Sequence, residues 1–189
     1  MFSHDTEHSL QVVVDLVNTA PEFGGSEELQ DAEALHEFVQ EHHVSGVGTL
    51  TPTDVASVHA VRKRFGTFFD LADPTDAATA VNSLLAEATV QPRLSRHDGY
   101  DWHMHYFPPD ATLAEHLAVD GGMALAHVVT EEETDRLSVC AAPDCDAVLV
   151  DLSRNRSKRY CDARSCGNRL HVAAYRERKR NEQLEVEDA

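Results

Sequence analysis

The sequence lacks the long hydrophobic runs and the leader segment of membrane and secreted proteins. None of its apolar stretches approaches the roughly 18 residues that a membrane-spanning helix requires. The first residues include no basic segment, and the apolar stretch 10–17 is short and interrupted by Asp15. With 7 Pro and 9 Gly in 189 residues, the composition also excludes collagen-like and low-complexity chains. We therefore expect a globular, cytoplasmic protein without a membrane partner.

Motifs of common enzyme classes are missing too. The chain contains no glycine-rich phosphate-binding loop, no G-x-S-x-G nucleophile elbow and no H-E-x-x-H zinc-protease motif. We therefore expect that the protein is not an enzyme.

Positive charge is scarce and unevenly distributed. The chain has 16 Lys and Arg against 33 Asp and Glu, a formal net charge of −17. Residues 1–136 carry six of the basic residues and 24 of the acidic ones, whereas residues 137–189 carry ten and nine. All ten of these basic residues lie within 153–180, where only two acidic residues oppose them. Because an acidic surface repels polyanions, only this C-terminal segment is suited to bind nucleic acid. The acidic excess elsewhere is typical both of a salt-rich cytoplasm and of an acidic sensor domain.

Apolar residues of the first part recur mostly at helical spacing, which predicts a mainly helical body. The segments 51–54 and 73–76 each combine a capping side chain, a proline and an acidic residue, which is typical of a helix start. They predict helices through about Phe69 and about Ala88. Residues 9–19 form either a helix or a strand.

Three further segments of the body have recognisable patterns. Ser26 is expected to cap a helix that ends near His43. Asp110 is expected to cap a helix over 111–133, with Gly121-Gly122 as a weak point inside it. Residues 90–95 and 100–107 are rich in aromatic and β-branched residues and predict a β-hairpin.

All four cysteines lie in the last third of the chain. Their spacing, C-x4-C-x15-C-x4-C, lets two close pairs of thiolates converge on one tetrahedral Zn²⁺. The predicted ligands of this structural zinc are Cys140, Cys145, Cys161 and Cys166. Two disulfides are disfavoured because such bonds are rare in the cytoplasm, and a thiol redox sensor is a further alternative.

A hairpin and a helix are predicted around the cysteines. Residues 147–151 form a short strand that pairs with 137–141, and Cys166 opens a helix that ends near Gln183. The predicted fold class is α+β: a mainly α-helical N-terminal body with a small β-hairpin, and a C-terminal zinc module made of a hairpin knuckle and a basic helix. We expect three parts, which are the body 1–136, the zinc module 137–184 and an acidic tail 185–189.

The basic residues form two groups beside the cysteines. One group lies in the loop between the cysteine pairs, and the other follows the last cysteine, where positions 169, 176 and 180 share one helix face. Several guanidinium groups held together by zinc are suited to bind DNA phosphates. The candidate contacts are Arg154, Arg156, Lys158, Arg159, Asn168, Arg169, Arg176 and Arg180. The alternative is that the helix docks on an acidic surface, either that of its own chain or that of a second copy in a homodimer. RNA is less favoured, because the segment lacks a series of aromatic residues for base stacking.

The residues around the last cysteine resemble a known family. The run Cys166-Gly167-Asn168-Arg169 is the one for which the CGNR zinc-finger family is named, and the similarity spans Cys140 to about Arg180. This resemblance implies the same four zinc ligands and a DNA-binding role for the finger. Family members usually carry an aromatic residue near 148–150 and Trp in place of Tyr160, so the chain departs from the pattern without touching the ligands.

A second resemblance lies near the N-terminus. The run Val-Asp-Leu-Val-Asn-Thr at 14–19 is similar to the opening of the ABATE-type domain. This domain commonly precedes the finger in bacterial proteins described as stress-induced transcriptional regulators. The two resemblances together imply a transcription regulator whose body senses a small-molecule effector or mediates assembly.

Two sets of polar residues in the body are candidates for further sites. Asp15 and Asn18 are candidate ligand-binding residues, with helix or turn capping as the alternative. His103 and His105 share one face of a predicted strand, which is suited to a second metal or a pH-responsive cluster. Because no cysteine or acidic pattern lies nearby, a structural role is favoured for these two histidines. The histidines on predicted helices, His116 among them, are assigned no role.

Overall fold

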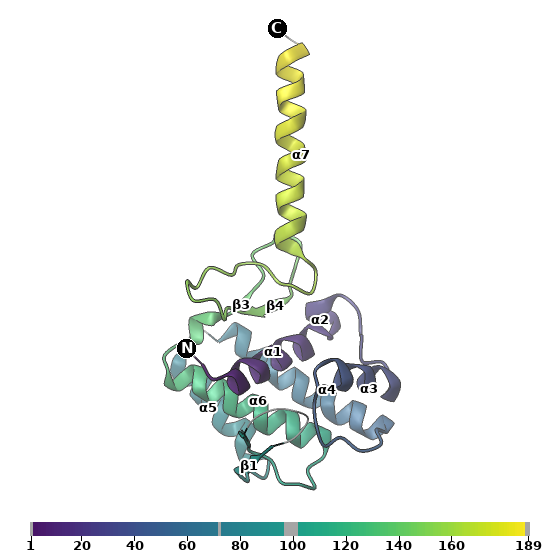
Figure 1. Ribbon diagram of the computed structural model, residues 1–189, viewed down its shortest axis with the longest axis vertical. Coiled ribbons are helices and arrows are strands. Elements are labelled where there is room, and N and C mark those ends of the chain that lie inside the picture. Colours follow the sequence, from purple (N-terminus) through teal and green to yellow (C-terminus); the bar gives the residue numbers. More distant parts are fainter. Residues whose placement is uncertain (1, 72, 97–101, 188–189) are drawn as a thin grey trace.

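Seven α-helices and two antiparallel two-stranded sheets make up the described part of the chain, residues 2–71, 73–96 and 102–187 of a computed structural model (Figure 1). The helices are α1 (His4–Asn18), α2 (Pro21–Gly24), α3 (Ala32–Glu41), α4 (Pro52–Gly66), α5 (Pro74–Ala86), α6 (Leu113–Thr130) and α7 (Cys166–Glu187). The strands are β1 (Arg93–Ser95), β2 (His103–His105), β3 (Leu137–Val139) and β4 (Val148–Val150). The short 3-10 helix η1 (Thr67–Asp70) follows α4, and a second one, η2 (Thr134–Arg136), precedes β3. The α+β class with a mainly helical body is confirmed.

The N-terminal segment that sequence left open between helix and strand is helical. Ser3 caps α1, because its hydroxyl accepts a hydrogen bond of 3.2 Å from the backbone amide of Thr6. Leu10, Val13 and Val17, which recur every three or four residues, are then buried on one side of the helix. Burial against other helices therefore outweighs the preference of this valine-rich segment for strands.

The two strongest helix starts in the sequence are confirmed. The carboxylate of Asp54 accepts hydrogen bonds from the backbone amide and the hydroxyl of Thr51 (2.8 and 2.6 Å) at the start of α4. Asp73 caps α5 through the amide of Thr75 (2.7 Å). In both helices the proline occupies the first turn, where its missing N–H costs nothing.

The predicted helix start at Ser26 is wrong. The helix begins at Ala32, where the carboxylate of Asp31 accepts two backbone hydrogen bonds of 3.0 and 2.9 Å. The residues before Ala32 do not form a helix, because Glu27 is held by Arg62 of α4 through hydrogen bonds of 2.7 and 2.5 Å. A contact between distant segments thus outweighs the local capping signal.

The expectations for α6 also need correction. Its N-cap is Thr112 rather than Asp110, with Glu115 completing a capping box. Gly121 and Gly122 do not interrupt the helix, which continues to Thr130. Both glycines are buried where neighbouring helices pack closely against α6.

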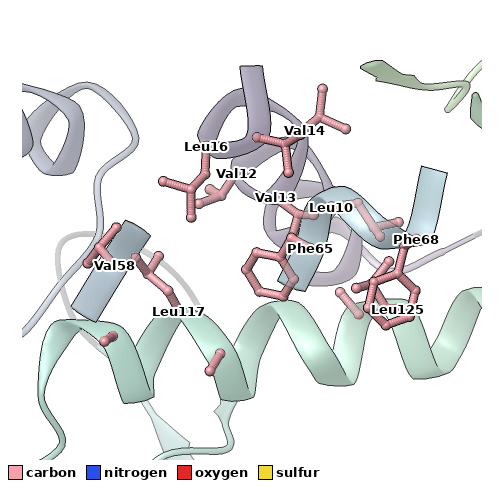
Figure 2. Close-up of a cluster of buried hydrophobic side chains, with 14 of the residues drawn as sticks. Leu10, Val12, Val13, Val14, Leu16, Val58, Phe65, Phe68, Leu117 and Leu125 are labelled. Atoms are coloured by element: carbon pink, nitrogen blue, oxygen red, sulfur yellow. The ribbon is translucent and has the colours of Figure 1, made fainter. Parts of the chain in front are cut away.

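The core of the body lies between α1, α4 and α6. Phe65 of α4 is 1% exposed, and Figure 2 shows its ring above α6 and beside Val13 of α1. A Cβ atom added to Gly121 would lie 2.5 Å from the Phe65 ring and 2.7 Å from Val13. The glycine therefore permits this close approach of three helices.

The two predicted hairpins are confirmed, with short strands. β1 pairs with β2 so that Arg93 lies opposite His105, and β3 pairs with β4 so that Leu137 lies opposite Val150. The turn expected between β1 and β2 lies mostly at 97–99, outside the described residues.

The C-terminal helix projects from the rest of the molecule. α7 begins at Cys166 as predicted and extends to Glu187, into the segment expected as an acidic tail (Figure 1). Across the described residues, no helix has both the length and the apolar character needed to cross a bilayer.

Candidate metal centre and nucleic-acid interface

Four cysteine side chains converge in the region that we call the cysteine module, residues 137–187. Their sulfur atoms all lie within 4.8 Å of one another, and none of the four residues is more than 6% exposed. Cys161 lies 3.6 Å from both Cys145 and Cys166, measured between sulfur atoms. A tetrahedral zinc with bonds of about 2.3 Å to sulfur would place neighbouring sulfurs about 3.8 Å apart. All four cysteines are free in the structure, and their arrangement is that of a metal site.

The electrostatics of the cluster favour a bound cation. Burial and the neighbouring thiols raise the pKa of Cys161 to about 12, and burial also raises the pKa of Cys145. Hydrogen bonds lower the pKa of Cys140, but four buried thiolates within 4.8 Å of one another would repel strongly and need a compensating positive charge. A divalent ion would supply that charge and hold all four in the ionised state.

The strand β4 attaches the cysteine module to the helical body. Val148 and Val150 belong to the core of the body, whereas Leu149 packs with the buried cysteines. Alternate residues of a strand point to opposite faces, so this three-residue strand contacts both parts. The hairpin that carries Cys140 and Cys145 is thus anchored to the body rather than tethered by a flexible linker.

Asn18 at the end of α1 completes the attachment. Its side-chain amide donates to the carbonyl of Val148 (2.9 Å), and its carbonyl accepts from the Val148 amide (2.8 Å). Asp15, one turn earlier, accepts a hydrogen bond from Gln11 (2.9 Å), and burial raises its pKa. Neither residue lines the two cavities described below. The ligand contact expected of Asp15 and Asn18 stays a prediction.

Two arginines that no sequence motif singles out, Arg136 and Arg164, also join the helical body to the cysteine module. The Arg136 guanidinium donates to the carbonyls of Asp151 (2.7 Å) and Ser153 (3.1 Å) in the basic loop. Arg164, between the last two cysteines, donates to the carbonyl of Gly24 at the end of α2. Arginines bonded to carbonyl groups of distant segments leave no signature in the local sequence.

The basic loop between the cysteine pairs is ordered by a buried carboxylate. Asp151 accepts hydrogen bonds from the amides of Ser153 and Lys158, both at 2.8 Å. Burial alone would raise the pKa of Asp151, but these bonds lower it below its usual value. The carboxylate therefore stays charged and fixes the course of the loop.

Three of the predicted DNA contacts, Arg156, Lys158 and Arg169, form ion pairs within the chain. Arg156 pairs with Glu133 (2.6 Å) and Asp135 (3.1 Å), and Lys158 pairs with Asp162 (2.8 Å).

Arg169 lies at the base of α7 and bridges the two cysteine pairs. It pairs with Asp144 and donates to the sulfur of Cys166 (3.3 Å). The Asp144 carboxylate raises the pKa of Arg169, and the guanidinium lowers that of Asp144. The structure therefore places Arg169 against the cysteine cluster.

The other candidates lie at the surface. Arg154, Arg159, Asn168, Arg176 and Arg180 are exposed, and among the described side chains the four arginines form no ion pair. Every residue of α7 from His171 to Arg180 is exposed, so the helix does not dock on the acidic body of its own chain. The structure brings the loop and the helix into one module, and DNA contact by these residues stays a prediction.

Comparison with known families supports both resemblances drawn from the sequence. A family model described as "CGNR zinc finger" matches residues 136–179. A second model, ABATE, described as "Putative stress-induced transcription regulator", matches residues 10–132, which is more than half of the chain. No curated protein matches the chain.

Proposed function

Given that this chain belongs to the ABATE family of transcription regulators and ends in a CGNR zinc finger, we propose that it is a zinc-dependent regulator that binds duplex DNA through its cysteine module. Zn²⁺ would be held by Cys140, Cys145, Cys161 and Cys166. Since four cysteines fill the coordination sphere, the metal would fold the module and leave no open position for catalysis. The helical body would sense an effector or mediate assembly.

The observation that carries the proposal is the exposed basic face of α7. Arg176 and Arg180 lie four residues apart on a helix that projects from the body (Figure 1). Arg169 at the base of the same face is held against the sulfur of Cys166, so the cysteine cluster fixes where this face begins. The exposed Arg154 and Arg159 in the loop extend the positive surface for phosphate contacts.

A selection from a random duplex DNA library tests the proposal. The full chain is loaded with zinc, and a chelated sample is run in parallel. We expect enrichment of a defined sequence by the zinc-loaded protein alone. If protein that is shown to contain zinc enriches no sequence, this result would contradict sequence-specific binding of duplex DNA.

A second function has one observation in its favour. Val172 and Tyr175 of α7 are 43% and 50% exposed beside the arginines of the same helix, and aromatic and arginine side chains are enriched at protein interfaces. On this reading the module is a scaffold that binds an acidic protein surface, such as the body of a second copy. Oligomers that dissociate in salt, together with no DNA binding, would favour the scaffold.

A further inference from the structure

A second group of metal-binding side chains lies in the helical body. Among the described residues, the donor atoms of His105, His116 and Asp120 lie within 4.8 Å of one another. The carboxylate Oδ2 of Asp120 is 3.2 Å from Nε2 of His116 and 3.7 Å from Nδ1 of His105. A metal ion with bonds of about 2.1 Å to nitrogen and oxygen would hold neighbouring donors about 3.0–3.4 Å apart. The two carboxylate–imidazole distances lie in or near this range, and the two imidazole nitrogens, which are within 4.8 Å of each other, would move closer together around an ion.

The three donors come from two elements, and both histidines are buried while Asp120 is partly buried. His105 ends β2 and is 7% exposed, whereas His116 is 8% exposed and lies one helical turn before Asp120 on α6. Residues four apart on a helix share a face, so His116 and Asp120 present their donors together. No acidic partner of His105 is evident in the sequence, because Asp120 reaches it only in the folded chain.

Neighbouring groups fix the orientation of each donor. The backbone amide of Tyr106 donates to Oδ1 of Asp120 (3.3 Å), which leaves Oδ2 directed at both histidines. The ring of Phe107 stacks on His116 with centroids 3.6 Å apart. Nε2 of His105 lies 3.1 Å from Nε2 of His103, so Nδ1 is the nitrogen on the side of Asp120. Outer partners of this kind set the tautomer and direction of metal-binding histidines.

Two cavities meet at the cluster. One, of about 320 Å³, is lined by the N-terminal half of α1, by β2 and by α6. The other, of about 520 Å³, lies on the side of β1 and residues 45–50. His105 and His116 line both, and Asp120 lines the first. An ion held by three side chains would therefore have coordination positions directed at open space.

We propose that His105, His116 and Asp120 bind a divalent first-row transition metal ion such as Zn²⁺, separately from the four cysteines. Two imidazoles and one carboxylate are ligands that such ions accept, whereas Mg²⁺ and Ca²⁺ prefer oxygen alone. Under the proposed function, this metal ion would be the effector that the helical body senses. The metal site can exist whether or not the protein binds DNA, and its test uses no DNA.

Metal content and Co²⁺ spectra of the full chain test the site. The protein is first loaded with one equivalent of Zn²⁺ and then titrated with Co²⁺. We expect a second bound ion whose spectrum lacks the intense sulfur-to-cobalt charge-transfer band of a thiolate site. His116→Gln and Asp120→Asn should abolish this second equivalent and keep the first. His103→Gln removes a neighbour of His105 but no proposed ligand, and it should lower the affinity for the second ion by about 10–100-fold.

A matched control is available on the same helix. His127 lines the first cavity from α6 but lies outside the cluster, so His127→Gln should retain two ions. Circular dichroism of each variant checks folding. A wild-type chain that binds a single ion, or a second ion that persists in Asp120→Asn, would overturn the site whether or not the protein binds DNA.

Discussion

The side chain of Asn18 pairs with both backbone polar groups of Val148, 130 positions further along the chain. An asparagine side chain carries one acceptor and one donor group, so it bonds to the peptide of Val148 much as a neighbouring strand would. This contact joins the end of α1 to the strand that also carries Leu149 into the cysteine cluster. The helical body and the candidate metal centre thus share one buried hydrogen-bonded junction.

Removal of this junction should destabilise the whole chain. In Asn18→Ala the buried amide and carbonyl of Val148 lose their partner, and each unsatisfied group costs about 1–3 kcal/mol. We expect the free energy of unfolding to fall by about 2–4 kcal/mol in urea titrations. The exposed Asn82→Ala on α5 serves as the control and should change it by less than about 0.5 kcal/mol. An unchanged midpoint for Asn18→Ala would refute the role of the junction.

Local signals predicted the parts of the structure that depend on local chemistry. Thr51 and Asp73 cap helices because their partners lie within three residues, and the cysteine spacing placed four thiols together. Ser26 failed as a helix start because Glu27 is bound by Arg62, 35 positions away. Contacts at such separation leave no pattern in one sequence.

The histidine cluster shows the same limit. His116 and Asp120 have ordinary helical positions, and only the packing of β2 against α6 brings His105 to them. The acidic partner that the sequence did not reveal is therefore supplied by tertiary structure.

Gly121 should not tolerate a side chain. In Gly121→Ala the new methyl group would lie 2.5 Å from the Phe65 ring, which is itself buried and cannot withdraw. Overpacking of this kind costs about 1–3 kcal/mol, to be measured as a lower free energy of unfolding. Gly48→Ala is the matched control, because nothing lies within 4 Å of its Cβ position. Equal stability of the two variants would show that α6 can shift away from α4.

The Glu27–Arg62 pair should make stability depend on pH. Hydrogen bonds from Arg62 lower the pKa of Glu27 below its ordinary value of 4.5. A carboxyl group with a lowered folded pKa adds stability that is fully present above its unfolded pKa and is lost as the pH falls through the folded value. We expect Glu27→Gln to reduce the free energy of unfolding by about 1.5–3 kcal/mol at neutral pH.

Urea titrations over a pH series check this dependence. The difference between wild type and Glu27→Gln should be present at neutral pH and shrink as the pH falls below 4.5. Glu87→Gln removes the partner of Arg64, but the Glu87 side chain is 68% exposed, so this control should have an effect near zero. A difference that grows toward acid pH would exclude the assigned pair.

The orientation of α7 on DNA can be tested with two arginines of equal charge. Arg176 lies on the face shared with Arg180, whereas Arg178, two residues further at 100° per residue, points to the other side of the helix. Both are exposed, so replacing either by alanine changes the net charge equally and disturbs no packing. Only the face that contacts phosphates should matter for duplex binding.

We expect Arg176→Ala to weaken binding of the selected duplex and to reduce the slope of log K against log salt by about one. Arg178→Ala should leave the slope unchanged, since a residue turned away from the duplex releases no counterion. Binding isotherms at several salt concentrations give both slopes. If the two variants lose affinity equally, the helix attracts DNA through its net charge alone. If neither loses affinity while zinc-loaded wild type still binds, the contacts lie in the loop that carries Arg154 and Arg159.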